Sequence, residues 1–262
     1  MRLLIGLFFS LLLSACLVAK HKIPKNNDNI TAITYIVKLP LVQGDRQYID
    51  FCDTIPIYYI QNLIIYKLPY TFDSSKMTYH IKTDTISQEH IMTETRYHYF
   101  VYKKGNNNGI WYKSIEQLDS NKILAVDSII KRIGTPTNLQ AIIYSLNDSL
   151  LESQSLDNGS ILIEKYIPKT KLDDSYNDTT LFYYSKRLKP IQFSLSPFLD
   201  SLKNKKLYKL RLAYNEAFSE TYSITMPKRD IIYEIREMNV DNIDNLKILL
   251  LRFKQDEKLL MK

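Results

Sequence analysis

The 262-residue chain carries 35 Lys and Arg against 28 Asp and Glu, a formal net charge of +7 at pH 7, and can bury a sizeable core. A net positive charge is compatible with nucleic acid, anionic lipid or acidic glycan as a partner. A solvated basic surface with no such partner is the simpler alternative. Only 6 residues are Gly, and neither a GxGxxG nor a GxxxxGKS/T phosphate loop occurs. The sequence therefore argues against the nucleotide-binding classes that depend on such loops.

The N-terminal stretch combines a basic residue, an apolar segment and a cysteine. Arg2 precedes the apolar residues 3–13, a segment too short for a permanent membrane-spanning helix, which needs about 20 residues. This pattern is typical of a secretory signal. The residues LSAC, which end at Cys16, resemble the lipobox of bacterial lipoproteins, a class whose members are cleaved before the cysteine and acylated on it.

The resemblance implies a domain organisation. Residues 1–15 would be the removed signal peptide, and the acylated Cys16 would attach the protein to the cell membrane or outer membrane, outside the cytoplasm. Such an export route argues against nucleic acid as a partner. The alternatives are a retained anchor, which would normally be longer, and plain secretion after cleavage at Ala19, for which Leu17 is a poor residue at the −3 position.

The residues after Cys16 predict a tether and then a single folded domain. Residues 16–30 are polar and lack a periodic apolar face, so we expect a flexible tether that reaches roughly 20 Å as a random coil. Residues 31–262 contain no domain-sized linker and no repeat of fixed period, which indicates one β-rich globular domain.

The first half of that domain predicts strands. Apolar and polar residues alternate over 33–39, and β-favouring residues run over 57–66, closed by Pro69. Further strands are expected at 77–83 and 95–103, with 95–103 turning through a five-residue loop at 105–109 and returning over 110–115. Because both faces of this hairpin are apolar or aromatic, we expect it inside the sheet and not at an edge.

The second half predicts more strands and a few short helices. Residues 123–133 fit a helix ambiguously, and Asp157-Asn158-Gly159 is a strong hairpin signal between strands at 149–156 and 160–167. Ser196 and Pro197 predict the start of a helix through 203. A polar loop is expected at 169–178, and the remaining strands are expected at 139–146, 181–185, 191–195, 208–214, 222–226 and 231–235.

The C-terminal residues predict a helix that packs on the sheet. Ile243, Leu246, Leu250 and Phe253 recur at spacings of 3, 4 and 3, one face of an α-helix, and Asp241 is a candidate N-cap. An exposed amphipathic helix is the alternative. The predicted fold class is therefore α+β: a predominantly antiparallel β-sheet with hairpins, a few short helices and a C-terminal amphipathic helix.

The sequence points to no catalytic group, metal site or cofactor. No HExxH motif and no Cys/His pair at zinc spacing occurs, although His80 and His98 would share a face if their strands paired. Cys52 is predicted to be a small buried hydrophobe, since no local motif marks it as a reactive thiol. The Ser128–Lys131 spacing matches SxxK, but the companion SDN and KTG elements are absent.

One basic stretch, interleaved with tyrosines, is a candidate surface for anionic headgroups or acidic glycan. The polar face of ordinary strands is the simpler alternative. The candidate residues are Lys186, Arg187, Lys189, Lys203, Lys205, Lys206, Lys209 and Arg211.

Three hypotheses for function follow. The first is a non-catalytic cell-envelope lipoprotein, a structural or partner-binding module that contacts the membrane through Cys16 and binds another envelope protein or an anionic glycan or lipid. The second is a carrier or sensor of an apolar ligand, which requires a large apolar cavity. The third is an envelope hydrolase, which requires a cleft where His80 or His98 meets a Ser or Asp.

Overall fold

The computed structural model describes residues 30–42, 48–80, 85–117, 121–133, 148–170, 177–219 and 223–261. The predicted signal peptide, Cys16 and residues 17–29 of the predicted tether lie outside this range, as does the strand predicted at 139–146. The described part is mostly antiparallel β-sheet with a few short helices, so the coarse fold prediction is confirmed.

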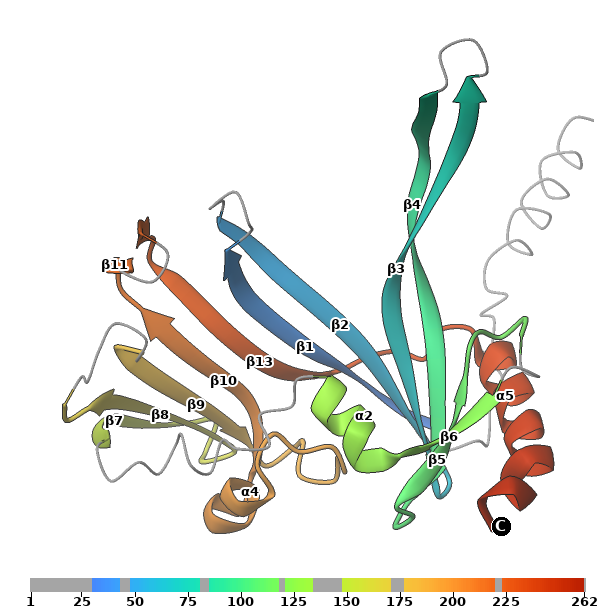
Figure 1. The fold of residues 1–262 in the computed structure, drawn as a ribbon. Coiled ribbons are helices and arrows are strands. Elements are labelled where there is room, and N and C mark those ends of the chain that lie inside the picture. Colours follow the sequence, from blue (N-terminus) through green and yellow to red (C-terminus); the bar gives the residue numbers. More distant parts are fainter. Residues whose placement is uncertain are drawn as a thin grey trace, which may run out of the picture.

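Eleven strands form one sheet in the described residues, with neighbouring strands antiparallel (Figure 1). The strand order is β6-β5-β4-β3-β2-β1-β13-β10-β9-β8-β7. Consecutive strands β1 to β6 pair as one meander, β7 to β10 pair as another, and β13 joins the two by pairing with β1 and β10. The strands are β1 (Ile30–Val42), β2 (Tyr48–Ile60), β3 (Leu63–His80), β4 (Thr85–Lys103), β5 (Asn108–Tyr112), β6 (Asn121–Ala125), β7 (Asp148–Leu156), β8 (Ile161–Pro168), β9 (Thr179–Ser185), β10 (Lys206–Tyr214) and β13 (Arg229–Glu237).

Short elements complete the described fold. The helices are α2 (Val126–Arg132), α4 (Pro197–Lys203) and α5 (Ile243–Asp256), and the 3-10 helix η1 (Glu257–Met261) follows α5. The strands β11 (Ala217–Ser219) and β12 (Ile224–Met226) form a separate two-stranded sheet.

One face of the sheet carries the larger hydrophobic core. Alternation in β1 directs Ile33, Tyr35 and Val37 to this face, where their exposed fractions are 4% or less. Helix α2 covers part of the face with Val126 and Ile129. The segment between β9 and α4 contributes further buried apolar side chains: Leu188, Ile191, Phe193 and Leu195.

The opposite face carries a second core under α5. Leu246, Leu249 and Phe253 are buried against strands β1 to β5, so the predicted packing of the C-terminal helix is confirmed. Asp256 fixes the end of the helix, since Arg252 lies 2.9 Å from it and Tyr112 donates to it at 3.3 Å.

Two details of the C-terminal prediction are wrong. Leu249, and not Leu250, completes the buried stripe, because Leu250 is only half-buried at its margin. Asp241 is not the N-cap. That position is held by Asn242, which has a φ of 52° and makes no side-chain capping hydrogen bond.

The run predicted at 57–66 is a hairpin and not a single strand. Gln61, with a φ of 56°, turns the chain between β2 and β3. Pro69 does not end β3, which continues to His80. Beyond Tyr66, β3 pairs with β4 but no longer with β2, and strands with one open edge tolerate a residue that lacks an N–H.

Several local predictions are confirmed. The 95–103 hairpin forms, and its return strand β5 lies inside the sheet between β4 and β6. The turn between β7 and β8 has positive φ at Asp157, Asn158 and Gly159, the conformation that this sequence favours. Ser196 caps α4 by accepting a hydrogen bond from the Leu199 N–H, with Pro197 as the first helical residue.

Other predictions differ from the structure. Residues 123–133 divide between β6 and α2. Residues 191–195 form no strand, although Ile191, Phe193 and Leu195 are buried. Both segments are apolar, and apolar content alone does not separate a strand from another buried conformation. Cys52 is exposed on β2, so its prediction as a buried hydrophobe is wrong.

Buried tyrosines make the fold sensitive to alkaline pH. Burial raises the pKa of Tyr58 and of Tyr99 to about 12, and the neighbouring Tyr97 and a nearby carboxyl group, Asp241 for Tyr58 and Glu116 for Tyr99, add to the shift. An unfolded tyrosine ionises at about pH 10. We therefore expect the stability that these groups contribute to be complete below about pH 10 and lost as the pH rises through 12.

Urea denaturation at a series of alkaline pH values, with phenolate absorbance recorded in parallel, measures this effect. The free energy of unfolding should fall above about pH 10 while the buried phenols ionise late. A free energy that stays constant up to about pH 12 would contradict the expectation.

Candidate functional site

The strand register places the strand ends along two opposite borders of the sheet, each running across the strands. One edge, low in Figure 1 and here called the lower edge, holds the start of β1, the β2–β3 turn, the end of β9 and the start of β10. Ile30 lies opposite Ile60 there, and Lys206 lies opposite Ser185. Since β3 runs away from this edge, its end at His80 lies on the other side of the molecule (Figure 1).

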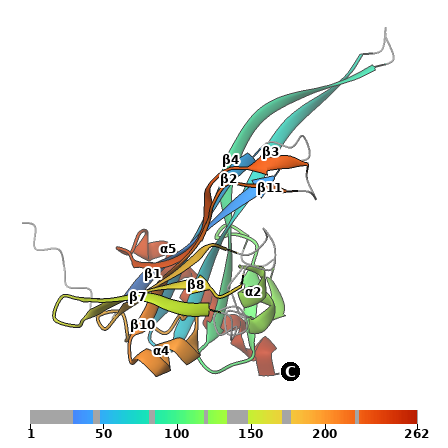
Figure 2. The same cartoon turned by 90° about the vertical axis from the view of Figure 1, so that its left-hand side faces the viewer.

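A long hairpin projects from that other side. We call residues 67–80 and 85–98 the arm, because they pair with each other beyond the last pairing of β3 with β2 and of β4 with β5. The arm stands clear of the rest of the fold in Figures 1 and 2. An isolated two-stranded ribbon is at best marginally stable in water, so the arm needs contacts along its faces to stay ordered.

One face of the arm tip is apolar and solvent-exposed. Tyr79 pairs with Ile86 across the ribbon, and Met77 lies two residues from Tyr79 on the same face. The exposed fractions of Met77, Tyr79 and Ile86 are 70%, 58% and 69%. Exposed apolar clusters of this kind are typical of interaction surfaces.

The other face of the tip is polar. Lys76 lies opposite Glu89 in the ribbon, a favourable cross-strand charge pair. His80 Nε2 lies 2.8 Å from Ser87 Oγ on the same face. The arm tip is therefore amphipathic across its two faces.

A cleft of about 620 Å³ lies at the base of the arm, where β5 has left the edge of β4. Its lining mixes aromatic rings with charged and polar groups: Tyr70, Phe72, Thr95, Arg96, Tyr97, His98, Tyr99, Lys113, Ser114, Ile115, Glu116, Gln117 and Asn245. The His98 ring stacks on Tyr70 with centroids 4.1 Å apart. Hydrogen bonding to Ser114 and its own backbone holds the pKa of the Glu116 carboxyl below its usual value.

The hydrogen bonds of the two predicted histidines do not pair either ring with an activated nucleophile. His98 lies in the cleft, but its Nδ1 lies 2.7 Å from the carbonyl oxygen of Lys113 and so donates to backbone. His80 meets Ser87, but on the exposed arm tip, and Ser87 Oγ donates to the Thr78 carbonyl at 3.5 Å. A hydroxyl that donates elsewhere is not activated by the imidazole beside it.

The structure brings most of the eight predicted basic residues into contact with carboxylates. Arg187 contacts Glu237 at 2.7 Å, Lys203 contacts Glu164 at 2.6 Å and Lys206 contacts Asp200 at 2.7 Å. On β10 and β13, Lys209 contacts Glu234 at 3.6 Å and Arg211 contacts Asp230 at 2.9 Å.

These pairs divide the predicted basic surface into two parts. Lys209 and Arg211 lie on the sheet face beside β13, whereas Lys186, Arg187 and Lys189 lie in the exposed turn after β9. The second part lies at the lower edge, next to α4.

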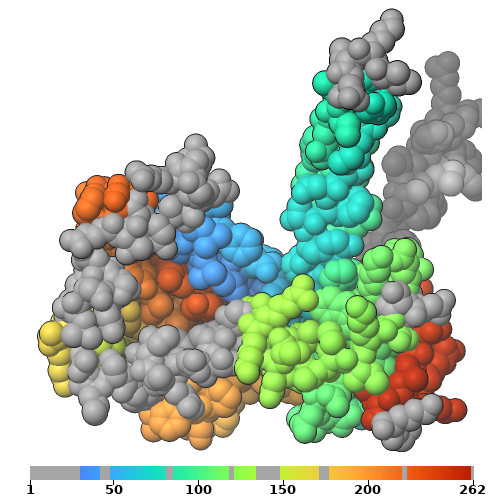
Figure 3. Space-filling model, viewed as in Figure 1, coloured from blue at the N-terminus to red at the C-terminus, as the bar shows by residue number. Residues whose placement is uncertain are grey.

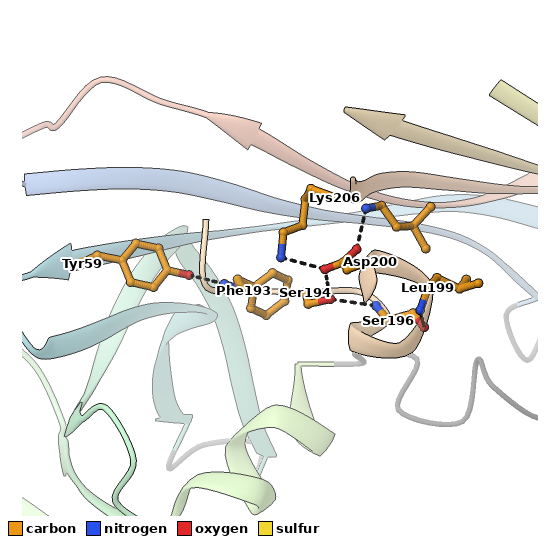
Figure 4. Close-up of polar contacts among 8 residues, drawn as sticks. Tyr59, Phe193, Ser194, Ser196, Leu199, Asp200 and Lys206 are labelled. Atoms are coloured by element: carbon orange, nitrogen blue, oxygen red, sulfur yellow. Dashed lines mark hydrogen bonds and ion pairs between the residues drawn. The ribbon is translucent and has the colours of Figure 1, made fainter. Parts of the chain in front are cut away.

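Asp200 organises the polar contacts of α4 (Figure 4). Its carboxylate accepts from Ser194 Oγ at 2.6 Å and from the Leu207 N–H at 2.6 Å, besides its contact with Lys206. Ser194 Oγ in turn accepts from the Ser196 N–H at 3.1 Å. Each group thus has a partner within the cluster, which is typical of a structural junction between helix and strand and not of a nucleophile awaiting substrate.

Among the residues that the structure describes, no group of three or more His, Cys, Asp or Glu could hold a metal ion. Within the same residues, no helix has the length and hydropathy to cross a bilayer. Neither the family models nor the curated proteins compared with this chain match it.

The arm is the surface that sequence reasoning missed. Pro69 predicts a strand end, and hence separate elements on its two sides. The available signal is that neither Pro nor Gly occurs from Tyr70 to His80 or from Thr85 to Tyr97, with only four residues between the two stretches.

Proposed function

We propose that this protein is a non-catalytic lipoprotein of the cell envelope, acylated on Cys16, that binds another envelope protein through its arm. The lipobox-like residues that end at Cys16 support the anchoring and the location outside the cytoplasm, at the cell membrane or outer membrane. The arm supports the partner-binding role.

The observation that carries the proposal is the apolar face of the arm tip. Met77, Tyr79 and Ile86 are large side chains that each keep more than half of their surface in water. They lie near the far end of an 18-residue strand, about 45–55 Å from the lower edge at roughly 3.3 Å per residue. A partner that covers them would bury apolar area and order the ribbon.

The two alternatives have less support. An apolar-ligand carrier requires a predominantly apolar cavity, whereas the cleft at the arm base includes Arg96, Lys113 and Glu116 in its lining. A hydrolase requires an activated nucleophile, and His80 and His98 contact groups that do not supply one. We also propose that α5 is amphipathic, since it buries Leu246, Leu249 and Phe253 while its charged residues Asp244, Lys247 and Lys254 are exposed.

A photocrosslinking residue placed in the arm tests the partner-binding role. Cells would make the full acylated protein with the crosslinker at position 86, on the apolar face, or at position 78, on the polar face. Ile86 and Thr78 are close on the same ribbon but point to opposite faces, because Ile86 lies opposite Tyr79 and Thr78 opposite Ser87.

We expect a discrete crosslinked product from position 86 that is absent from position 78 and lost when Met77 and Tyr79 are changed to Ser. Identical products from both positions, or no product from either, would contradict a partner-binding role for this face. The thermal midpoint of each variant, measured on purified protein, controls for folding.

A further inference from the structure

The outer side of α4 is apolar and faces solvent. Phe198 and Leu202 are four residues apart, hence on one side of the helix, and their exposed fractions are 47% and 56%. Leu199, on the inner side, is buried in the main core. The helix therefore presents two large apolar side chains outward while Leu199 and Asp200 hold it to the body.

Basic side chains lie at the C-terminal end of α4. The turn after β9 lies against the end of α4, because Lys189 Nζ donates to Asn204 Oδ1 at 2.5 Å. Lys186, Arg187 and Lys189 in that turn are exposed, and Lys205, directly after the helix, is half-exposed. We call Phe198, Leu202, Lys186, Lys189 and Lys205 the α4 patch.

The carboxylates near the α4 patch are engaged by other cations. Glu237 contacts Arg187, Asp200 contacts Lys206, and Glu164, with only 5% of its side chain exposed, contacts Lys203. These ion pairs neutralise the carboxylates, so the outward side of the α4 patch stays basic. A surface that combines lysines with exposed apolar residues matches the chemistry of an anionic membrane surface, which offers phosphate groups above acyl chains.

The α4 patch also lies on the side of the molecule where the described chain begins. Register places Ile30, the first described residue, at the same lower edge as Ser185 and Lys206, which flank the turn and α4. Figures 1 and 3 show α4 at the lower edge and the arm tip on the opposite side. A tether between Cys16 and Ile30 would therefore hold the lower edge towards the bilayer.

We infer that the α4 patch docks on anionic lipid headgroups, with Phe198 and Leu202 at the boundary between headgroups and acyl chains. Lys186, Lys189 and Lys205 face the lipid phosphates. Acidic glycan would match the lysines but gives the two apolar side chains no role, so lipid is the better fit. The docked orientation rests on the proposed anchoring through Cys16, and it directs the arm away from the membrane.

Vesicle sedimentation tests this inference without the acyl chains. The probe is the full mature chain from residue 16 with Cys16→Ser, mixed with vesicles of phosphatidylcholine alone or with about one third phosphatidylglycerol. We expect binding to the anionic vesicles only. The pair Phe198→Ser and Leu202→Ser should weaken that binding about tenfold, and each Lys→Glu change at Lys186 or Lys189 about fivefold or more, as expected for charges near an anionic leaflet.

Matched controls use exposed residues far from the α4 patch. Leu251→Ser removes a similarly exposed apolar side chain from α5, and Lys76→Glu reverses a charge on the arm; neither should change vesicle binding. Thermal midpoints of all variants should stay near that of the parent, since every substituted residue is solvent-exposed.

Three vesicle results would each overturn the inference: equal binding to both vesicle types, no binding to either, or binding that the Phe198 and Leu202 changes leave intact. Equally strong binding to an anionic polysaccharide, insensitive to the Leu202 change, would assign the lysines to glycan and also overturn it. The Cys16→Ser probe cannot be acylated, so failure of vesicle binding is distinct from failure of anchoring. Fatty-acid labelling of Cys16 tests anchoring separately.

Discussion

Phe253→Ala should lower the free energy of unfolding by about 3–5 kcal/mol, the usual cost of removing a fully buried phenyl ring. Phe253 has no exposed surface and packs with Leu246 and Leu249 between α5 and the sheet. The loss would be a large share of a typical domain stability of about 5–15 kcal/mol. Urea denaturation of residues 16–262 with Cys16→Ser measures it.

Two neighbouring residues on α5 provide the controls. Leu251, with 64% of its surface exposed, should change the free energy of unfolding by less than about 0.5 kcal/mol when changed to Ala. Leu250, at the half-buried margin, should give an intermediate loss. Equal losses at Phe253 and Leu251 would show that α5 does not pack through the Leu246–Leu249–Phe253 side.

Asp200→Ala should cost about 3–5 kcal/mol, because it leaves the Lys206 ammonium without its counter-charge in a buried position. Only 7% of the Lys206 side chain is exposed, and Asp200 also accepts from Ser194 and from the Leu207 N–H (Figure 4). The same urea titration detects the loss. Relative to the parent protein, protection from hydrogen exchange should fall most in the region around α4.

The double variant Asp200→Ala with Lys206→Met separates the charge effect from the hydrogen bonds. Removing both charges should recover part of the stability, since an uncompensated buried charge costs more than an absent pair. Glu237→Ala is the matched exposed control: its pair with Arg187 is 45% and 75% exposed and should contribute less than about 1 kcal/mol. An Asp200→Ala loss no larger than the Glu237→Ala loss would contradict the structural role of Asp200.

Local patterns predicted most of the strands. Alternation in β1 and β10, the loop between β4 and β5, and the Asp157-Asn158-Gly159 turn each depend on neighbouring residues, so the sequence alone carries the information. The α4 start was predictable for the same reason, because Ser196 and Pro197 act within one helical turn.

The features that the sequence does not predict depend on contacts between residues that are distant along the chain. Whether Pro69 ends a strand depends on whether its other edge is paired, and β2 leaves β3 only three residues before it. The basic residues were interpreted as one surface, yet their carboxylate partners are distant in sequence, as Glu164 is from Lys203. Leu250 and Leu249 could not be separated by spacing alone, because both lie on the apolar side of α5.

Metabolic labelling with a fatty acid, followed by membrane fractionation, tests the central claim most directly. Cells would make the wild type, Cys16→Ser or Cys52→Ser, which together cover the 2 cysteines of the chain. The account predicts a labelled, membrane-bound wild type and Cys52→Ser variant, and an unlabelled Cys16→Ser variant released from membranes. An unlabelled wild type, or a Cys16→Ser variant that keeps the label, would contradict it.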